Sequence, residues 1–125
     1  MIPKGIALDL NTRKLQVVLA AAGTIPVTVC FIDIPQREKT DTSAYRPATQ
    51  FATTNGTNAV DICDAPAQGT VRVIHYICVH DSDAGAETVT IKINDNSTDR
   101  IQVIMALATT ESMIWTPESG WNITT

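Results

Sequence analysis

The sequence predicts an all-β protein, folded as a single antiparallel β-sandwich or jelly-roll-like domain of about eight to ten short strands over residues 1–125. Two observations lead to this prediction. Apolar and polar residues alternate in several short segments, and turn-forming residues separate these segments at short intervals. No window shows the apolar stripe with a period of about 3.6 residues that a surface helix needs. A chain of 125 residues has about the size of one domain with one core.

Three segments carry the clearest strand patterns. Residues 88–93 read Thr-Val-Thr-Ile-Lys-Ile and predict a half-buried strand, because side chains alternate between the two faces of a sheet. In residues 71–79, alternation places Val73 and Ile77 on one face and Ile74, Tyr76 and Cys78 on the other. Both faces are apolar, which predicts a central strand whose second face is either core or subunit contact. In the segment 100–107, alternation places on one face Ile101, Val103, Met105 and Leu107.

Seven further segments are short and rich in β-branched residues, which predicts strands. In chain order they are Ile6–Leu10, Leu15–Ala20, Val27–Ile34, Gln50–Thr54, Ala59–Cys63, Met113–Thr116 and Trp121–Thr124. Residues 15–22 resemble the apolar part of a signal peptide, but they start late and follow Asp9. We therefore interpret them as a strand of the mature protein.

Two turn signals stand out between the predicted strands. Asn55-Gly56 predicts a hairpin, since both residues tolerate the positive φ of a type I′ turn. Asn94, Asp95 and Asn96 lie between the strands predicted at 88–93 and 100–107. Their side chains could coordinate a cation or a sugar hydroxyl, but Asn and Asp also reverse the chain, and chain reversal is the interpretation that we favour.

The polar segment at about residues 35–49 interrupts the regular spacing of strands. It is bounded by prolines and is longer than most connections within a small domain, which is typical of a functional loop. A solvated excursion between the sheets explains the same composition. If the loop contacts a partner chain, the predicted interface residues are Arg37, Lys39, Tyr45 and Arg46.

Charge and the length of apolar runs argue against binding to nucleic acid and against a membrane span. The formal net charge is −4 and the basic residues are scattered, so direct binding to nucleic acid is not expected. No apolar run approaches the about 18 residues of a membrane helix.

Cys30, Cys63 and Cys78 are widely spaced within or beside apolar runs, which predicts buried free thiols in a reducing compartment.

No complete catalytic or metal-binding signature occurs. Residues 81–87, Asp-Ser-Asp-Ala-Gly-Ala-Glu, resemble the start of a calcium loop but lack further ligands, and a turn explains them as well. His75 and His80 are five residues apart and would lie on opposite faces of a strand; we expect His75 to be hydrogen-bonded or at an interface. We predict a protein that is not an enzyme and has no cofactor or metal.

Several stretches occur in an order that resembles small all-β structural proteins of tailed-phage virions. They are a Thr-Asn-Gly-Thr hairpin within Thr53–Ile62, an Ala-Pro-Ala turn within Ala65–Ile74, an Asn-Asp-Asn tip within Val89–Asn96 and the pair Gly120-Trp121. The amino-terminal part, including Leu15–Ala20, is similar too, so the resemblance spans nearly the whole chain. Ser97 stands where this group commonly has glycine, and His80-Asp81 replaces a Tyr-Asn-like pair.

The resemblance implies a virion structural protein that acts by adhesion. It implies a capsid cement or decoration subunit, most often a homotrimer, which binds the major capsid protein on the outside of the shell. The protein would be made in the host cytoplasm and located on the virion surface. The alternative is a tail, neck or fibre component that acts as a receptor-binding or carbohydrate-binding module.

Overall fold

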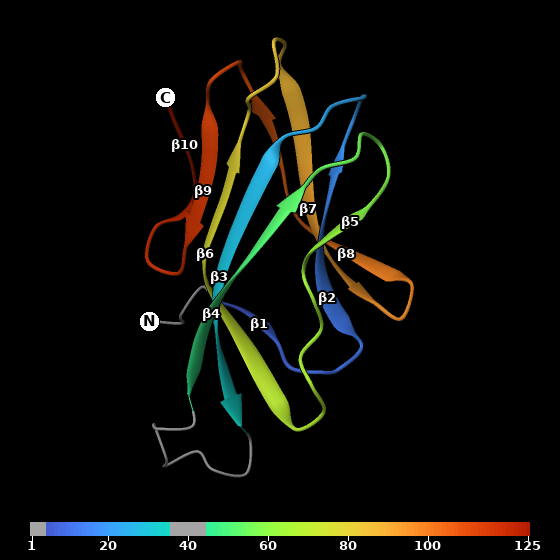
Figure 1. Ribbon diagram of the computed structural model, residues 1–125, viewed down its shortest axis with the longest axis vertical. Coiled ribbons are helices and arrows are strands. Elements are labelled where there is room, and N and C mark those ends of the chain that lie inside the picture. The colour runs from blue at the N-terminus through green and yellow to red at the C-terminus, as the bar shows by residue number, and fades with distance from the viewer. Residues whose placement is uncertain (1–4, 36–44) are drawn as a thin grey trace.

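Ten strands make up the computed structural model, which describes residues 5–35 and 45–125 (Figure 1). They are β1 (Ile6–Leu8), β2 (Arg13–Leu19), β3 (Pro26–Pro35), β4 (Arg46–Thr53), β5 (Val60–Cys63), β6 (Thr70–His80), β7 (Glu87–Asp95), β8 (Thr98–Leu107), β9 (Ser112–Thr116) and β10 (Gly120–Thr124). Each predicted strand segment corresponds to one of these strands. The prediction of an all-β sandwich is confirmed.

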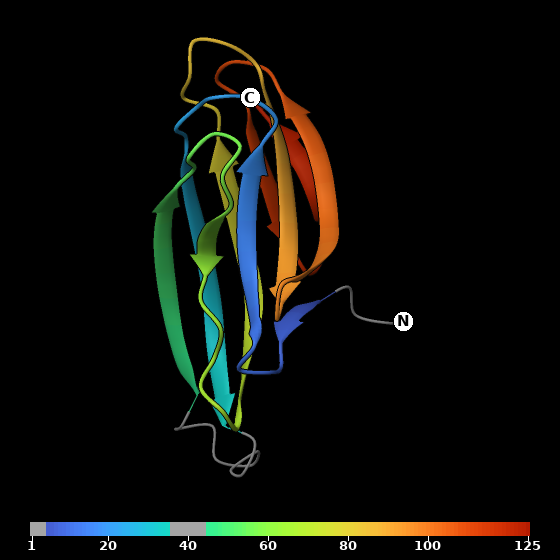
Figure 2. The same cartoon turned by 90° about the vertical axis from the view of Figure 1, so that its right-hand side faces the viewer.

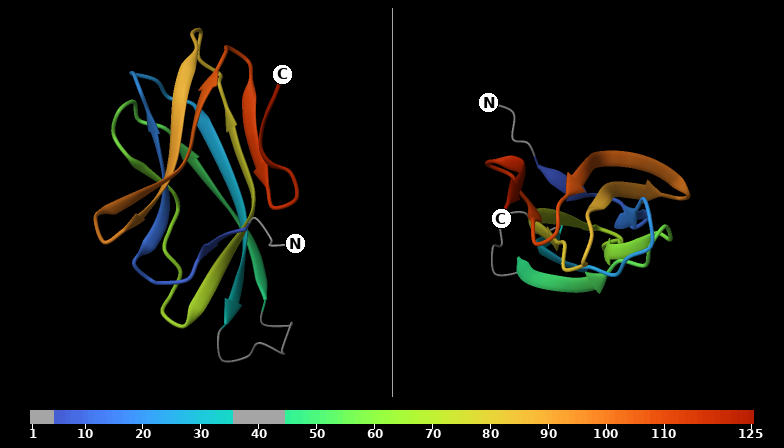
Figure 3. Two further views of the ribbon diagram at one scale, coloured as in Figure 1. Left: turned by 180° about the vertical axis from the view of Figure 1, so that it is seen from behind. Right: turned by 90° about the horizontal axis from the view of Figure 1, so that it is seen from above.

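The strands form two antiparallel sheets that face each other (Figures 2 and 3). Sheet A has the order β10-β9-β6-β3-β4, and β1 pairs with β6 beside this path. Sheet B has the order β5-β2-β7-β8. Neighbours in these sheets are mostly distant in the sequence, as in the pairing of β3 with β6 and of β2 with β7.

Strand β4 begins earlier than the sequence predicted. Arg46–Thr49 was expected to belong to the long polar loop, but these residues pair with Cys30–Asp33 of β3. The strand contains Pro47, which is tolerated because β4 is an edge strand of sheet A and one side of its backbone has no partner strand. Residues 36–44 of the predicted loop lie outside the described residues.

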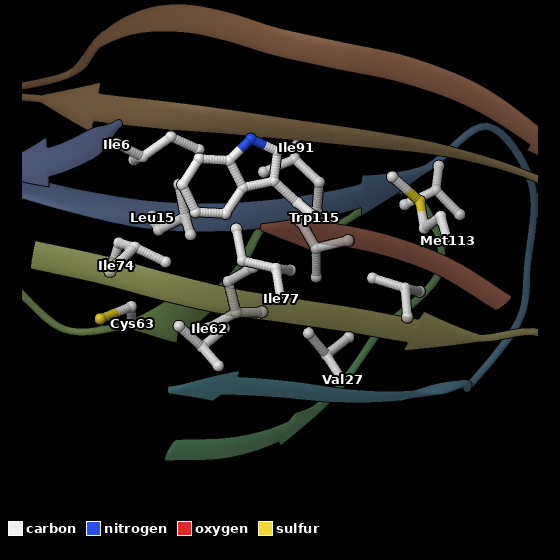
Figure 4. Packing of buried hydrophobic residues seen from close by; sticks show 14 of the residues in the cluster. Ile6, Leu15, Val27, Ile62, Cys63, Ile74, Ile77, Ile91, Met113 and Trp115 are labelled. Carbon is white, nitrogen blue, oxygen red and sulfur yellow. The ribbon is translucent and has the colours of Figure 1, made fainter. Parts of the chain in front are cut away.

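The core is the apolar layer between the sheets. Sheet B contributes alternate residues of β2 and β7, among them Leu15 and Ile91, and sheet A contributes Val27, Ile74 and Ile77, all fully buried or nearly so. Figure 4 shows these side chains pointing toward one another, with the Trp115 indole between them. The indole stays only 3% exposed and packs against Trp121, with ring centroids 6.2 Å apart.

Two β-bulges change which side chains face the core. On β6, His75 has no partner on β3, because Cys30 pairs with Tyr76 and Phe31 with Ile74. On β8, Gln102 has no partner on β7, because Ile91 pairs with Val103 and Lys92 with Ile101. An extra residue reverses the alternation beyond it.

Because of these bulges, the predicted faces were wrong for part of both strands. Ile101 was expected on the same face as Val103, but it points outward and is 60% exposed, like Ile104 at 59%. Ile74 was expected on the same face as Tyr76, but it is fully buried while Tyr76 is only partly covered.

The turn at Asn55-Gly56 is tight, but it is not the predicted hairpin of paired strands. The strands on either side, β4 and β5, belong to different sheets. The Asn58 N–H donates to the Asn55 carbonyl at 3.0 Å, and of the pair only Gly56 has positive φ, at 56°. The turn therefore carries the chain from one sheet to the other.

Four loops meet at one end of the sandwich, at the top of Figure 1; we call this the loop end. It comprises residues 20–25, 54–59, 81–86 and 108–111, which connect β2 to β3, β4 to β5, β6 to β7 and β8 to β9. Backbone hydrogen bonds join the loops in pairs: Gly56 N to Gly23 O at 2.9 Å, Asp81 N to Glu111 O at 2.8 Å. The Thr109 hydroxyl also donates to the Ala84 carbonyl at 3.1 Å.

Arg72 links strands and a loop near the other end. Its guanidinium donates to both carboxylate oxygens of Asp33 at 2.8 and 3.0 Å and to the Asp64 carbonyl at 2.8 Å. Its Cζ also lies 4.2 Å from the centre of the Phe31 ring. Burial raises the pKa of the neighbouring Cys63 thiol to about 11, so this thiol stays protonated at neutral pH.

We expect Arg72→Ala to lower the free energy of unfolding by about 2 to 3 kcal/mol, because the substitution leaves the partly buried Asp33 carboxylate unpaired and removes the contact with Phe31. Urea denaturation measures this change. Lys14→Ala is the matched control, since the Lys14 and Asp61 side chains are 36% and 39% exposed and such a pair contributes about 0.5 kcal/mol. Equal losses in the two variants would contradict a structural role for Arg72.

Candidate interaction face

The polar tip at residues 94–98 is a hairpin turn. Asp95 pairs with Thr98, and the two residues between them, Asn96 and Ser97, have φ of 50° and 72°. Positive φ at both central positions is the requirement of a type I′ turn. The predicted chain reversal is therefore confirmed.

The side chains of Asn94 and Asp95 at the tip form hydrogen bonds with other side chains of the protein. Asp95 accepts hydrogen bonds from the Thr12 hydroxyl at 2.8 Å and from Arg13 Nε at 3.0 Å, and these bonds hold the pKa of this carboxyl below its usual range. Asn94 Nδ2 donates to Asp99 Oδ1 at 2.7 Å. The tip thus connects β7, β8 and the turn before β2, and these groups need no ligand to satisfy them.

Ser97→Gly should raise the free energy of unfolding by about 0.5 to 1 kcal/mol, because a left-handed conformation strains any residue with a Cβ and glycine relieves that strain. Thermal or urea unfolding gives the value. The control is Ser119→Gly in the turn between β9 and β10, where φ is not positive, and this change should stabilise nothing. A neutral or destabilising Ser97→Gly would show that the turn is not strained.

The two histidines do not form a site together. His80 Nδ1 lies 2.7 Å from the Ser112 hydroxyl on the neighbouring strand β9. His75 lies half-buried at the bulge of β6, and its Nδ1 is buried without a hydrogen-bond partner among the described residues; that His75 lies at an interface remains a prediction. Within residues 5–35 and 45–125, no group of three or more His, Cys, Asp or Glu side chains is arranged to hold a metal ion.

The predicted interface residues fall at the start of β4. Arg37 and Lys39 lie outside the described residues. Tyr45 is half-buried just before the strand, and Arg46 is exposed as its first residue, opposite Asp33 of β3. The described pair therefore borders one edge of sheet A, and whether this edge contacts a partner remains a prediction.

The outward face of sheet A is apolar. Of the side chains that alternation and register place there, we define seven as the A face: Cys30 and Ile32 of β3, Phe51 of β4, Val73, Tyr76 and Cys78 of β6, and Ile114 of β9. Phe51 is 76% exposed and the other six are half-buried. Thr28, Thr49 and Thr116 lie between them, and no outward residue of these four strands is Asp, Glu, Lys or Arg.

The outward face of sheet B is charged and satisfies its charges across strands. Lys14 of β2 lies 3.3 Å from Asp61 of β5, and Lys92 of β7 lies 2.8 Å from Asp99 of β8. The exposed Ile101 and Ile104 on the edge strand β8 are its main apolar side chains. Because charged residues are depleted at the centre of protein interfaces, the A face is the better candidate for a contact.

The polar groups of the A face are one phenol and two thiols, and they carry no formal charge at neutral pH. Burial, and next to it the neighbouring Cys78 thiol, raise the pKa of the Tyr76 phenol. Cys30 Sγ lies 3.5 Å from the Thr49 hydroxyl. Cys30 pairs with Tyr76 and Cys78 with Thr28, so the two cysteines are diagonal neighbours, a separation too large for a disulfide.

The predicted free thiols are confirmed, although only Cys63 is fully buried while Cys30 and Cys78 are half-buried. The A face offers apolar area, three hydroxyl-bearing threonines and one phenol, which suits adhesion. Sequence reasoning left Tyr76 and Cys78 open between core and contact. The feature of the sequence that could have identified the A face is the absence of charged residues from alternate positions of 28–32, 47–51 and 112–116.

Comparison with protein families, curated proteins and solved structures finds no match to this chain. Within the described part of the chain, no helix is long and apolar enough to cross a membrane.

Proposed function

We propose that this chain is a non-enzymatic structural subunit of a tailed-phage virion, a cement or decoration protein that binds the outside of the capsid shell. The observation that carries the proposal is the A face, an apolar sheet face on which no outward residue is Asp, Glu, Lys or Arg, whereas the outward face of sheet B pairs lysines with aspartates. The resemblance of its turns to small virion proteins supplies the identity of the partner, the major capsid protein.

The A face has the composition expected at the centre of a protein interface. A stable protein interface covers about 800 Å² on each partner, with an apolar centre and a polar rim. The face spans four neighbouring strands, from Phe51 on β4 to Ile114 on β9, and its residues sit on paired backbone that does not need to rearrange on binding. Little conformational entropy is therefore lost when a flat partner surface covers it.

Phe51→Asp should weaken binding to capsid shells at least about tenfold, because it places a charge at the most exposed position of the A face. Co-sedimentation with shells that lack the decoration protein measures the binding. Ile104→Asp is the matched control, since Ile104 is also exposed on an edge strand but lies on the outward face of sheet B.

Three results would contradict the proposal. Loss of binding with Ile104→Asp but not with Phe51→Asp would place the contact on sheet B. Co-purification of the wild-type chain with tails and not with shells would favour a tail or fibre component. Binding on a glycan array, with no affinity for shells, would favour a carbohydrate-binding module.

The chain should form a homotrimer in solution at micromolar concentration, with three times the 13.5 kDa mass of one chain. Strands β4 and β8 are each an edge of their sheet, so that one side of the backbone of each has no partner strand among the described residues. A closed ring covers such edges, which are aggregation sites in a monomer. Light scattering coupled to size exclusion measures the mass, and a monomer would show that the trimer is wrong.

A further inference from the structure

Two carboxyl groups at the loop end lie against the same glycine. Asp83 belongs to the loop between β6 and β7, and Glu87 is the first residue of β7. A Cβ added to Gly23, in the loop between β2 and β3, would lie 2.6 Å from Asp83 Oδ2 and closer still to Glu87 Oε2. The two carboxyl groups therefore fill the space that a side chain at position 23 would occupy, which places them close to each other.

The surroundings of this pair contain no positive charge among the described residues. Asp81 and Asp83 are the charged groups that act on Glu87, and both are acidic. Asp81 is fully buried; its Oδ1 accepts from the Asp83 N–H at 3.0 Å, and its Oδ2 has no partner among the described residues.

The other loops at this end add little charge. The loops at 20–25 and 54–59 contain no titratable residue. Glu111, in the loop between β8 and β9, uses its carboxylate to accept the Ala108 N–H at 2.7 Å. Leu107 of β8 is the residue opposite Glu87.

When no counter-charge lies beside them, two carboxyl groups this close to each other resist being ionised at the same time. A hydrogen bond between them requires that one carries a proton, which it donates to the other. The whole Glu87 residue is only 7% exposed, so water does not screen the repulsion fully.

We propose that Asp83 and Glu87 share one proton, and that this acid–carboxylate hydrogen bond is a pH-sensitive latch between the loop that follows β6 and the loop that follows β2. When the proton is present, both side chains pack on the Gly23 backbone. When it leaves, the two negative charges, with Asp81 beside them, repel one another. The strands keep their register, and the loop end loosens.

The direction of the pH effect follows from the acid involved. The hydrogen bond to Asp83, burial and the nearby carboxylates raise the pKa of Glu87 from 4.5 to about 7 in the folded protein. The folded state thus holds a proton that the unfolded state has already lost. The stabilisation is complete below about pH 4.5 and disappears as the pH rises through about 7.

The test compares the wild-type melting temperature at about pH 5.5 and about pH 8 with that of Glu87→Gln. The amide of Gln donates to Asp83 at every pH, so the wild type should lose about 4 °C or more on going to the higher pH while Glu87→Gln loses clearly less. Glu118→Gln, an exposed change in the turn between β9 and β10, should keep the wild-type dependence. Any pH dependence that comes from other groups is common to the variants and cancels in their difference.

A second measurement does not depend on a variant. In carbon-13 labelled wild-type protein, the Glu87 carboxyl carbon should titrate near pH 7, and Gly23→Ala, which separates the carboxyl groups, should move this midpoint toward that of an ordinary glutamate. A wild-type midpoint between about 4 and 5, or equal pH dependence in wild type and Glu87→Gln, would overturn the proposal. It would also be overturned if calcium alone raised the melting temperature at pH 8 through these residues, since a cation and not a proton would then join them.

Discussion

The apolar layer between the two sheets determines where every other side chain of the described strands points. Leu15, Ile77 and Ile91 exclude water from this layer, and a strand that contributes one inward residue must turn the next one outward. A slip of one residue would bury Lys92 or Asp99 and expose the core. The outward faces and the loop end are consequences of this constraint, because the chain can vary them without disturbing the buried residues.

The two outward faces meet water in different ways. Sheet B places lysine and aspartate on neighbouring strands, so that its charges pair with each other, as Lys14 does with Asp61. Sheet A places Tyr76, Cys78 and Ile114 in the equivalent outward positions and leaves their apolar area partly uncovered. Such an area lowers the solubility of a monomer, and it is the surface to which the proposed partner would bind.

Strand positions could be predicted from the sequence because alternation and turn residues act locally, and all ten segments were identified. The bulges at His75 and Gln102 could not, since an extra residue is defined by the strand opposite, and the faces of Ile74 and Ile101 were wrong for that reason. The loop between β6 and β7 was recognised as acidic. Its contact with Gly23 could not be predicted, because Gly23 lies 60 residues before Asp83 in the chain. The start of β4 was missed because Pro47 is usual in loops and is tolerated only on an edge.

The pairing of β6 has a consequence for how the chain folds. This strand is the centre of sheet A and takes its partners from β1, β3 and β9, which lie at the beginning and near the end of the sequence. Among the described strand pairs, the hairpins β7–β8 and β9–β10 are the ones that close short loops at low entropic cost. During synthesis β6 leaves the ribosome before β9 exists, so one of its edges stays open until the last strands arrive. Folding of this protein is therefore governed by long-range strand pairing, and the interval before β9 docks is when the chain is most exposed to aggregation.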